Sequence, residues 1–245
     1  MDSNLKEACN AIPDSIFSDF TIPWSMTTAE KAVFIQLLQH IKPKVAIEIG
    51  TYNGGSLQVL SHYSEKVYAI DLTPSYRDER CDHLSNIEYL IGDSKRITPE
   101  LVEKLNTSDE IVNFILIDGD HSTEGIVEDI TNILKLKPKQ PITIVLHDSF
   151  NPTCRKGMQM YDYSSHPLVS YVELDYVTGA FSHDGLYKEM WGGFACIVLS
   201  PEKRLTPLKI SAYQEKLFKT TYYRSIHFYR KFFWFLKPFY KVFKK

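Results

Sequence analysis

Short apolar runs alternate with longer amphipathic segments along the first 150 residues of the chain. The runs are rich in β-branched side chains, as buried strands are, and they span residues 45–49, 66–70, 87–91, 111–117 and 142–146. A capping pattern opens a helix near residue 28, and further helices are predicted from residue 57 and over 77–80, 99–105 and 123–136. Strands that alternate with helices form a parallel sheet covered on both faces, so the pattern predicts a doubly wound α/β fold.

The pattern changes after residue 150. Residues 171–176 alternate between apolar and polar side chains, and residues 194–199 form another apolar run. Two strands this close in sequence can pair side by side as an antiparallel hairpin. We therefore expect such a hairpin, with residues 179–193 as the long loop between its strands.

The stretch from Lys44 to Ser56 carries the first candidate for ligand binding. Its apolar run ends at Gly50, and a second pair of glycines follows at Gly54-Gly55 before apolar residues resume at helical spacing. A strand, a glycine turn and a helix in this order let the backbone approach a ligand at a helix N-terminus. Glu48 is a carboxylate inside the apolar run, so we expect it to form a hydrogen bond with a polar group.

Polar residues follow each of the five runs, and all would meet at one edge of a parallel sheet. Ligands bind at the carboxyl ends of the strands in open α/β sheets, which makes this edge the predicted site. The residues at these ends are Gly50, Asp71, Asp93, Asp118 and Asp148.

Composition and charge restrict the class of protein. The chain is 44% apolar and 24% charged, which is typical of a globular protein, and its net charge of −2 gives no reason to expect a nucleic-acid partner. The four cysteines lack the spacing of a zinc site, so we expect reduced thiols in a cytoplasmic protein. We expect no signal peptide, and no apolar run approaches the roughly 20 residues that span a bilayer.

Residues 221–245 differ in composition from the rest of the chain, with seven lysines and arginines, eleven aromatic residues and no acid. Interfacial membrane anchors combine rings and cations in this way. We therefore expect a domain over residues 1–210, with a helical cap over 1–43, and a basic aromatic tail over 211–245. The alternatives to contact with the inner face of the membrane are packing on the domain and a homo-oligomer interface.

Three segments carry a resemblance to a known family: Glu-Ile-Gly-Thr-Tyr-Asn-Gly-Gly-Ser at 48–56, Ile-Asp-Gly-Asp-His-Ser at 117–122 and Leu-His-Asp-Ser at 146–149. Together with Trp191-Gly192-Gly193, they resemble class I S-adenosylmethionine-dependent methyltransferases. The similar branch is the one grouped with cephalosporin-hydroxylase-like and macrolide sugar O-methyltransferases. The resemblance covers about residues 25–200 and implies a Rossmann-like sheet of seven strands, mostly parallel, with an antiparallel C-terminal strand.

The resemblance implies a cofactor role for several of these residues. The backbone at Gly50 and Gly54 would pass under the methionine part of S-adenosylmethionine, with Glu48 anchoring the turn or the cofactor amine. Asp71 would accept the two ribose hydroxyls, since a carboxylate offers two acceptor oxygens to a diol. The adenine would lie beside Asp93, and the implied cofactor set is completed by Tyr52, Ser56, Ser94 and Asp118.

The resemblance also implies a metal and a base. Asp118 and Asp148 would hold Mg²⁺, with Ser149 at a position where relatives often carry Asn or Asp. A general base would be His121 or His147, because an imidazole titrates near neutral pH. The implied reaction is O-methylation of a hydroxyl on a sugar or another small molecule or glycan precursor.

Two other functions remain as alternatives. A nicotinamide-dependent oxidoreductase also uses a glycine loop, but its pattern places a second glycine where this chain has Tyr52. A tyrosine there would crowd a pyrophosphate, so the spacing favours a cofactor without phosphates. The second alternative is a non-catalytic binding protein with a Rossmann-like fold.

Overall fold

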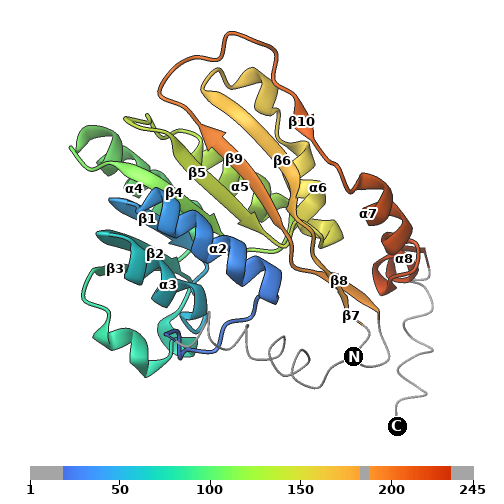
Figure 1. The fold of residues 1–245 in the computed structure, drawn as a ribbon, viewed down its shortest axis with the longest axis horizontal. Helices are drawn as coiled ribbons and strands as arrows, with labels where there is room; N and C mark the ends of the chain where they lie inside the picture. Colours follow the sequence, from blue (N-terminus) through green and yellow to red (C-terminus); the bar gives the residue numbers. More distant parts are fainter. Residues whose placement is uncertain (1–18, 183–187, 233–245) are drawn as a thin grey trace, which may run out of the picture.

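The computed structural model describes residues 19–182 and 188–232, and they form a three-layered α/β structure around one large sheet (Figure 1). The strand order is β10-β6-β9-β5-β4-β1-β2-β3. The five predicted parallel strands are confirmed as β1 (Val45–Ile49), β2 (Lys66–Asp71), β3 (Ile87–Ile91), β4 (Val112–Ile117) and β5 (Ile142–His147). Because they run parallel, their carboxyl ends lie at the same edge of the sheet.

The predicted antiparallel hairpin is also present. β9 (Phe194–Leu199) runs antiparallel between β5 and β6 (Val169–Val177). A two-residue strand, β10 (Ile210–Ser211), adds an eighth strand at the edge beside β6. The Rossmann-like fold is therefore confirmed, with one short strand beyond the seven that the family resemblance implies.

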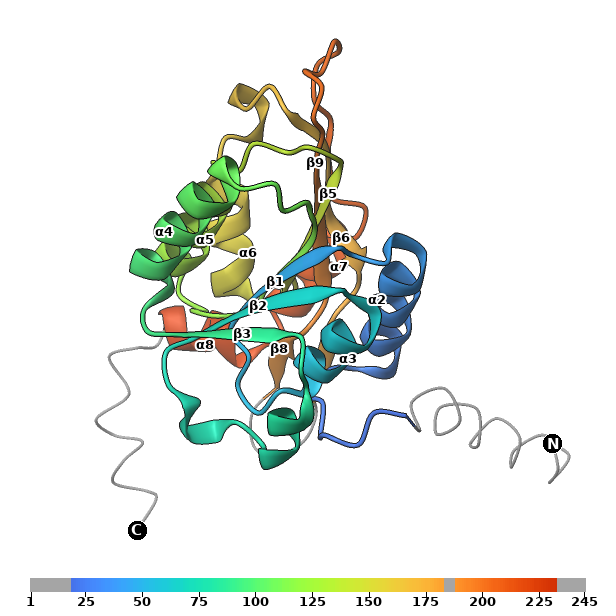
Figure 2. The same cartoon turned by 90° about the vertical axis from the view of Figure 1, so that its left-hand side faces the viewer.

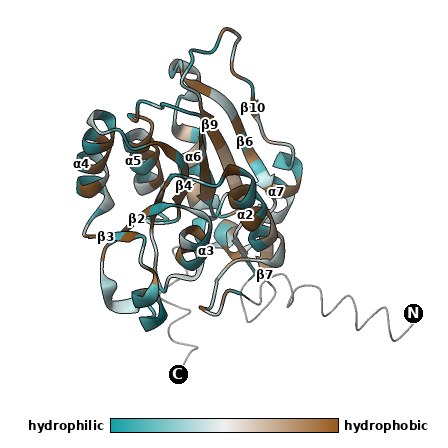
Figure 3. Cartoon of the chain, turned by 60° about the vertical axis from the view of Figure 1, so that its left-hand side comes forward, coloured by the Kyte–Doolittle hydropathy of each residue, from teal (hydrophilic) through white to brown (hydrophobic). Residues whose placement is uncertain are grey.

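Helices cover both faces of the sheet (Figure 2). α2 (Thr28–Ile41) and α3 (Gly55–Tyr63) lie on one face, and α4 (Ser94–Thr107), α5 (Thr123–Ile133) and α6 (Pro152–Met160) lie on the other. Alternate residues of β1 divide between two cores, since Ala46 packs with α2 and α3 whereas Ile47 and Ile49 pack with α4 and α5. The central strands accordingly consist largely of hydrophobic residues (Figure 3).

Three predicted elements differ from the structure. α4 begins at Ser94 and not at residue 99, because the Asp93 side chain caps the helix and Pro99 is accommodated inside it. In place of the helix predicted at 77–80, two short 3₁₀ turns are present at Pro74–Tyr76 and Glu79–His83, with residues 77 and 78 between them. The predicted loop 179–193 contains a small hairpin, β7 (Ala180–Ser182) and β8 (Glu189–Trp191).

Two short helices, α7 (Glu215–Tyr222) and α8 (Ile226–Phe232), follow β10. No helix among the described residues is long and apolar enough to cross a membrane. Residues 233–245 of the predicted tail, and residues 1–18 of the predicted N-terminal cap, lie outside the described residues.

Arg155 of α6 joins α7 to the sheet. Its guanidinium is 1% exposed and lies 2.7 Å from an oxygen of the buried Asp175 and 2.8 Å from Glu215 of α7. It also stacks 4.6 Å from the centre of the Phe218 ring. One buried cation thus holds α6, β6 and α7 together.

We expect Arg155→Met to lower the free energy of unfolding by about 3–5 kcal/mol, because it leaves the Asp175 carboxylate buried without its cation. Urea unfolding of the full chain measures the change. Lys219→Met is the matched control, since it removes an exposed ion pair with the same Glu215 and should cost less than about 1 kcal/mol. An equal loss of unfolding free energy in the two variants would contradict the role of Arg155 as the buried cation that joins α6, β6 and α7.

Candidate active site

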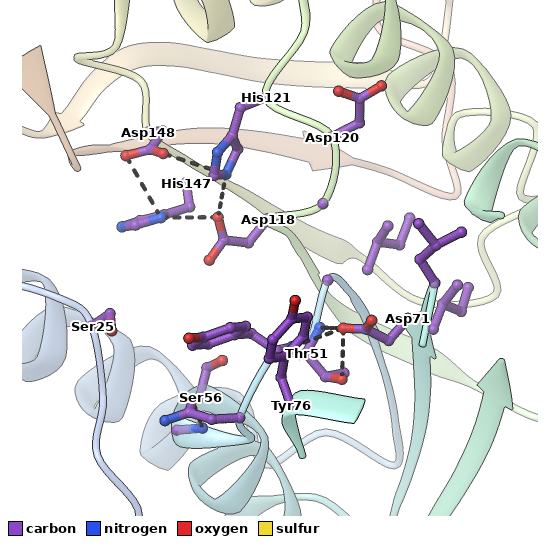
Figure 4. Close-up of a pocket in the computed structure, with 18 of the residues that line it drawn as sticks. Ser25, Thr51, Ser56, Asp71, Tyr76, Asp118, Asp120, His121, His147 and Asp148 are labelled. Atoms are coloured by element: carbon purple, nitrogen blue, oxygen red, sulfur yellow. Dashed lines mark hydrogen bonds and ion pairs between the residues drawn. The ribbon is translucent and has the colours of Figure 1, made fainter. Parts of the chain in front are cut away.

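A cavity of about 1010 Å³ lies at the carboxyl edge of the parallel strands, where the sequence predicts the site (Figure 4). Its wall comes from the turns that follow β1 to β5, from residues 24–27 before α2 and from Trp191 of β8. Of the predicted site residues, the cavity is lined by Gly50, Tyr52, Ser56, Asp71, Asp93, Ser94, Asp118, His121, His147 and Asp148. Glu48, Gly54 and Ser149 lie behind this wall.

The glycine turn after β1 requires its glycines. Gly50 has φ 87° and Gly54 has φ 92°, in the region that side chains disfavour. A Cβ on Gly50 would collide with the Asp118 carbonyl, and one on Gly54 would collide with the Cys81 sulfur. The turn therefore lies closely against the end of β4, as a loop that passes under a ligand must.

Asp71 fixes this turn in place. Its Oδ2 accepts hydrogen bonds of 2.8 Å from the backbone N–H groups of both Thr51 and Tyr52, and the Thr51 hydroxyl donates to the same oxygen. Its Oδ1 accepts a bond of 3.1 Å from Thr73 N. Tyr52 has a positive φ of 47°, and its exposed ring lies 5.4 Å from that of Tyr76 at the cavity wall.

Glu48 lies beneath the turn and is fully buried. Its Oε1 accepts a 2.5 Å hydrogen bond from Ser56 Oγ at the start of α3, and its Oε2 is buried without a hydrogen-bond partner among the described residues. Burial raises the pKa of Glu48 to about 8, against the lowering effect of the Ser56 bond. The Glu48 carboxyl is therefore mostly protonated at neutral pH.

Asp93 and Ser94 form the wall after β3. The Asp93 side chain accepts from Lys95 N and caps α4, whereas the Ser94 hydroxyl donates to Asp129 of α5 at 2.9 Å. Asp120 is half-exposed beside Lys95 and points away from the other acids of the site (Figure 4).

A cluster of two acids and two histidines forms the facing wall (Figure 4). Asp118 Oδ1 lies 3.0 Å from His147 Nδ1 and 3.3 Å from His121 Nε2. His121 Nε2 is also 3.4 Å from Asp148 Oδ2, and Asp148 Oδ1 accepts a hydrogen bond of 2.5 Å from Gly192 N. The ends of β4 and β5 thus place both predicted bases between Asp118 and Asp148, two of the three predicted metal ligands.

The charges of the cluster lower the pKa of Asp118 and raise the pKa of both histidines, whereas burial raises the pKa of Asp148. Burial opposes ionisation of Asp118, but the two histidines outweigh it and lower its pKa to about 2. Burial likewise opposes charge on His147, and the surrounding acids Asp118, Glu30 and Asp148 raise its pKa well above the usual value. The pKa of His121 is raised by its bond to Asp118. The histidines therefore tend to carry the positive charge that two close carboxylates need.

Glu30 is a residue of the site that the sequence pattern identifies only as a helix cap. The predicted capping box is present, since Glu30 Oε2 accepts from Thr27 N at 2.5 Å. Its other oxygen reaches the cluster, where Oε1 lies 3.4 Å from His147 Nε2 and accepts a hydrogen bond from Gly193 N. Glu30 is 1% exposed, so it is a third buried acid beside the histidines.

The donor atoms of Asp118, His147 and Asp148 lie within 4.8 Å of one another and fit a divalent cation. The carboxylates suit Mg²⁺, whereas the imidazole is a ligand that ions such as Zn²⁺ accept more readily. Ser149, the third ligand predicted from the sequence, is buried with its hydroxyl against Gly193. Its role as a ligand stays a prediction.

Residues 47–149 match the family model of a methyltransferase domain. The solved structure of the Bacillus cereus O-methyltransferase in complex with SAH is 18% identical, with a TM-score of 0.55, over 82% of this chain and 92% of that chain. Cofactor-bound Rv0187 from MTB is also 18% identical, with a TM-score of 0.53 and the same coverage. TomG from Streptomyces achromogenes, an O-methyltransferase in complex with SAM, is 14% identical, with a TM-score of 0.53, over 82% of this chain and 91% of that chain.

None of the curated proteins matches the sequence significantly. The likeness to the solved structures shows the fold, and the family match adds a methyltransferase domain that runs from β1 to the end of β5. Residues 47–149 therefore match a methyltransferase domain within a Rossmann-like fold, and this match includes the glycine turn and the two strand ends on which the predicted resemblance rests.

We expect Glu48→Gln to remove a pH dependence of stability. The folded pKa of about 8 lies above the ordinary value of about 4.3, so the unfolded chain ionises first and stability falls as the pH rises between these values. Glutamine resembles the protonated carboxyl and does not titrate. Between pH 5 and pH 8, the free energy of unfolding of the variant should therefore rise by roughly 3–5 kcal/mol relative to that of the wild type.

Urea unfolding at pH 5, 6, 7 and 8 measures this difference. Glu128→Gln is the control, because its exposed carboxylate pairs with Lys95 and should leave the pH profile unchanged. Parallel profiles for the wild type and Glu48→Gln would show that Glu48 is ionised in the folded protein.

Proposed function

We propose that the chain is an S-adenosylmethionine-dependent O-methyltransferase that methylates a hydroxyl of a sugar or another small glycan precursor. The observation that carries this proposal is the arrangement of one cavity, in which the glycine turn faces the acid–histidine cluster (Figure 4). A methyl donor bound on the turn would meet a hydroxyl held at the cluster. The names of two similar structures support it, since both are O-methyltransferases in complexes with SAH or SAM.

The cofactor would lie across the ends of β1 to β4. Its methionine part would pass over Gly50, close to Tyr52, Ser56 and Asp118, where the turn has no side chain to obstruct it. The ribose hydroxyls would donate to Asp71, whose oxygens already order the turn, so cofactor and turn would share one carboxylate. The adenine would occupy the wall of Asp93 and Ser94.

His121 is the better candidate for the base. Its side chain is 43% exposed and lies beside Trp191 on the cavity wall, whereas the His147 side chain is 9% exposed and enclosed by Glu30 and Asp118. In the proposed step the acceptor O–H bond breaks and its proton passes to the neutral His121 imidazole. The oxygen forms a bond to the methyl carbon, and the electrons of the S–CH₃ bond return to sulfur. His147 would hold Asp118 in position.

A divalent cation would be held by Asp118, His147 and Asp148, and Mg²⁺ remains the ion that the sequence suggests. When bound there, such an ion orients a hydroxyl and lowers its pKa. Independently of the ion, the acceptor would lie against the rings of Trp191 and His121, whose centres are 6.0 Å apart.

We expect His121→Ala to lower the rate of methyl transfer by about 10²–10⁴-fold, the usual contribution of a general base, while affinity for S-adenosylhomocysteine stays unchanged. Transfer of tritiated methyl groups from S-adenosylmethionine to a panel of sugars and methyl glycosides measures the rate, on the acceptor that the wild type methylates fastest. Because the pKa of His121 is raised and a base must first lose its proton, the wild-type rate should rise with pH above 6.5.

His62→Ala is the matched control, because His62 packs against Phe20 and Tyr63 outside the cavity. It should keep the wild-type rate. A His121→Ala variant that keeps more than a tenth of the wild-type rate would contradict the assignment of the base.

We propose that the segment 221–245 contacts an anionic membrane surface, as its composition predicts. The described part of this segment supports the proposal, because Tyr223 at the end of α7 and Tyr229 of α8 are both exposed. α8 also packs against β8 at the cavity, where His227 Nε2 accepts from Met190 N at 3.3 Å. A membrane contact there would place the cavity near lipid-linked acceptors.

We expect the wild-type chain to float with vesicles of phosphatidylglycerol and phosphatidylcholine, and not with phosphatidylcholine alone. Substituting Lys237, Lys241, Lys244 and Lys245 by Gln should abolish flotation, because each basic residue contributes about 1 kcal/mol near an anionic surface. Lys95→Gln and Lys216→Gln control for a loss of charge elsewhere. Unchanged flotation of the four-lysine variant would remove the membrane role.

A further inference from the structure

Ser94 and Asp129 form a hydrogen-bonded pair in the cavity wall that the proposed reaction does not use. Ser94 is the first residue of α4 and lines the cavity, and its hydroxyl donates to Asp129 Oδ1 at 2.9 Å. Asp129 lies on α5 and is 1% exposed. The only side-chain hydrogen bond of this buried carboxylate among the described residues therefore goes to a residue of the wall.

The second oxygen of Asp129 is buried without a hydrogen-bond partner among the described residues. It lies directly behind Gly119, since a Cβ on Gly119 would be 3.6 Å from Oδ2. Gly119 also lines the cavity, so Asp129 stands behind the turns that follow both β3 and β4. A buried and incompletely paired carboxylate is costly to fold, which suggests a role beyond stability.

The pair fixes the direction in which the Ser94 hydroxyl points. Burial raises the pKa of Asp129 to about 6, against the effect of the Ser94 bond, so the carboxyl is mostly ionised at pH 7.5. An ionised carboxylate only accepts hydrogen bonds, and a serine hydroxyl has one proton and two lone pairs. Because Asp129 takes that proton, Ser94 can present only lone pairs to the cavity.

We propose that Asp129 sets the purine preference of the cavity by holding Ser94 as a hydrogen-bond acceptor. This inference rests on the proposed function, which places the adenine of the cofactor beside Ser94. The exocyclic amine of adenine is a donor and matches the serine lone pairs. Hypoxanthine carries a carbonyl oxygen at the same position, and its lone pairs would face those of Ser94. Asp129 is thus a positioning residue that acts through Ser94.

Calorimetric titration of the full chain with S-adenosylhomocysteine and with S-inosylhomocysteine tests the proposal. We expect the wild type to bind the adenosyl ligand at least about tenfold more tightly, since a mismatched buried polar group is strongly disfavoured. Asp129→Leu replaces the carboxylate by an apolar group of similar shape and frees the Ser94 hydroxyl to rotate. The variant should bind the inosyl ligand more tightly than the wild type does, and the preference should fall below about threefold.

Ser94→Ala should also reduce the preference for the adenosyl ligand, because it removes the hydrogen-bond acceptor. Unlike Asp129→Leu, it should not increase the affinity for the inosyl ligand. Glu128→Gln is the matched control, since it removes a nearby acid of α5 that pairs with Lys95 and does not contact Ser94. This control should keep the wild-type ratio of the affinities for the adenosyl and inosyl ligands. Thermal unfolding of each variant confirms that it is folded.

A merely structural role for Asp129 would weaken both ligands equally and leave the ratio at its wild-type value, which would overturn the inference. A wild type that binds both ligands equally would overturn it as well, while leaving the proposed function intact. A wild type that binds neither ligand would refute the proposed function and this inference together.

Discussion

The site depends on one electrostatic constraint, which is that several carboxylates must share a small space at the edge of the sheet. Parallel strands bring Asp118 and Asp148 together, and Glu30 of α2 adds a third buried acid. Close carboxylates repel unless positive charge lies between them. His147 and His121 supply that charge, and their contacts connect α2, β4 and β5. The same contacts shape the wall against which an acceptor would lie.

The opposite wall is organised by backbone geometry. Gly50 permits the turn to lie against the end of β4, and Asp71 orders the turn through two backbone N–H groups. Glu48 beneath it is held mostly neutral by burial, so no unpaired charge lies under the proposed methyl donor. One wall is thus a turn ordered by hydrogen bonds above a mostly neutral Glu48, and the other is a cluster of acids and histidines able to exchange protons. This asymmetry would suit the proposed transfer of a methyl group to oxygen.

Much of this arrangement could be predicted from local patterns in the sequence. Apolar runs indicated the five parallel strands, and polar residues at their ends indicated the edge at which the cavity lies. Glu30 was not predicted as part of the site, because the capping box explains one of its oxygens and only tertiary packing places the other beside His147. The early start of α4 was missed because Pro99 suggested an N-terminus, whereas Asp93 caps the helix. The place of Glu30 thus depends on a neighbour distant in sequence, whereas the start of α4 depends on a cap next to the helix.

The glycine turn is proposed to bind S-adenosylmethionine and not a dinucleotide. Calorimetric titration of the full chain with S-adenosylhomocysteine and separately with NAD⁺ tests it most directly. We predict saturable binding of S-adenosylhomocysteine and none of NAD⁺, because Tyr52 stands where a pyrophosphate would need a second glycine. Binding of NAD⁺ without binding of S-adenosylhomocysteine would contradict it.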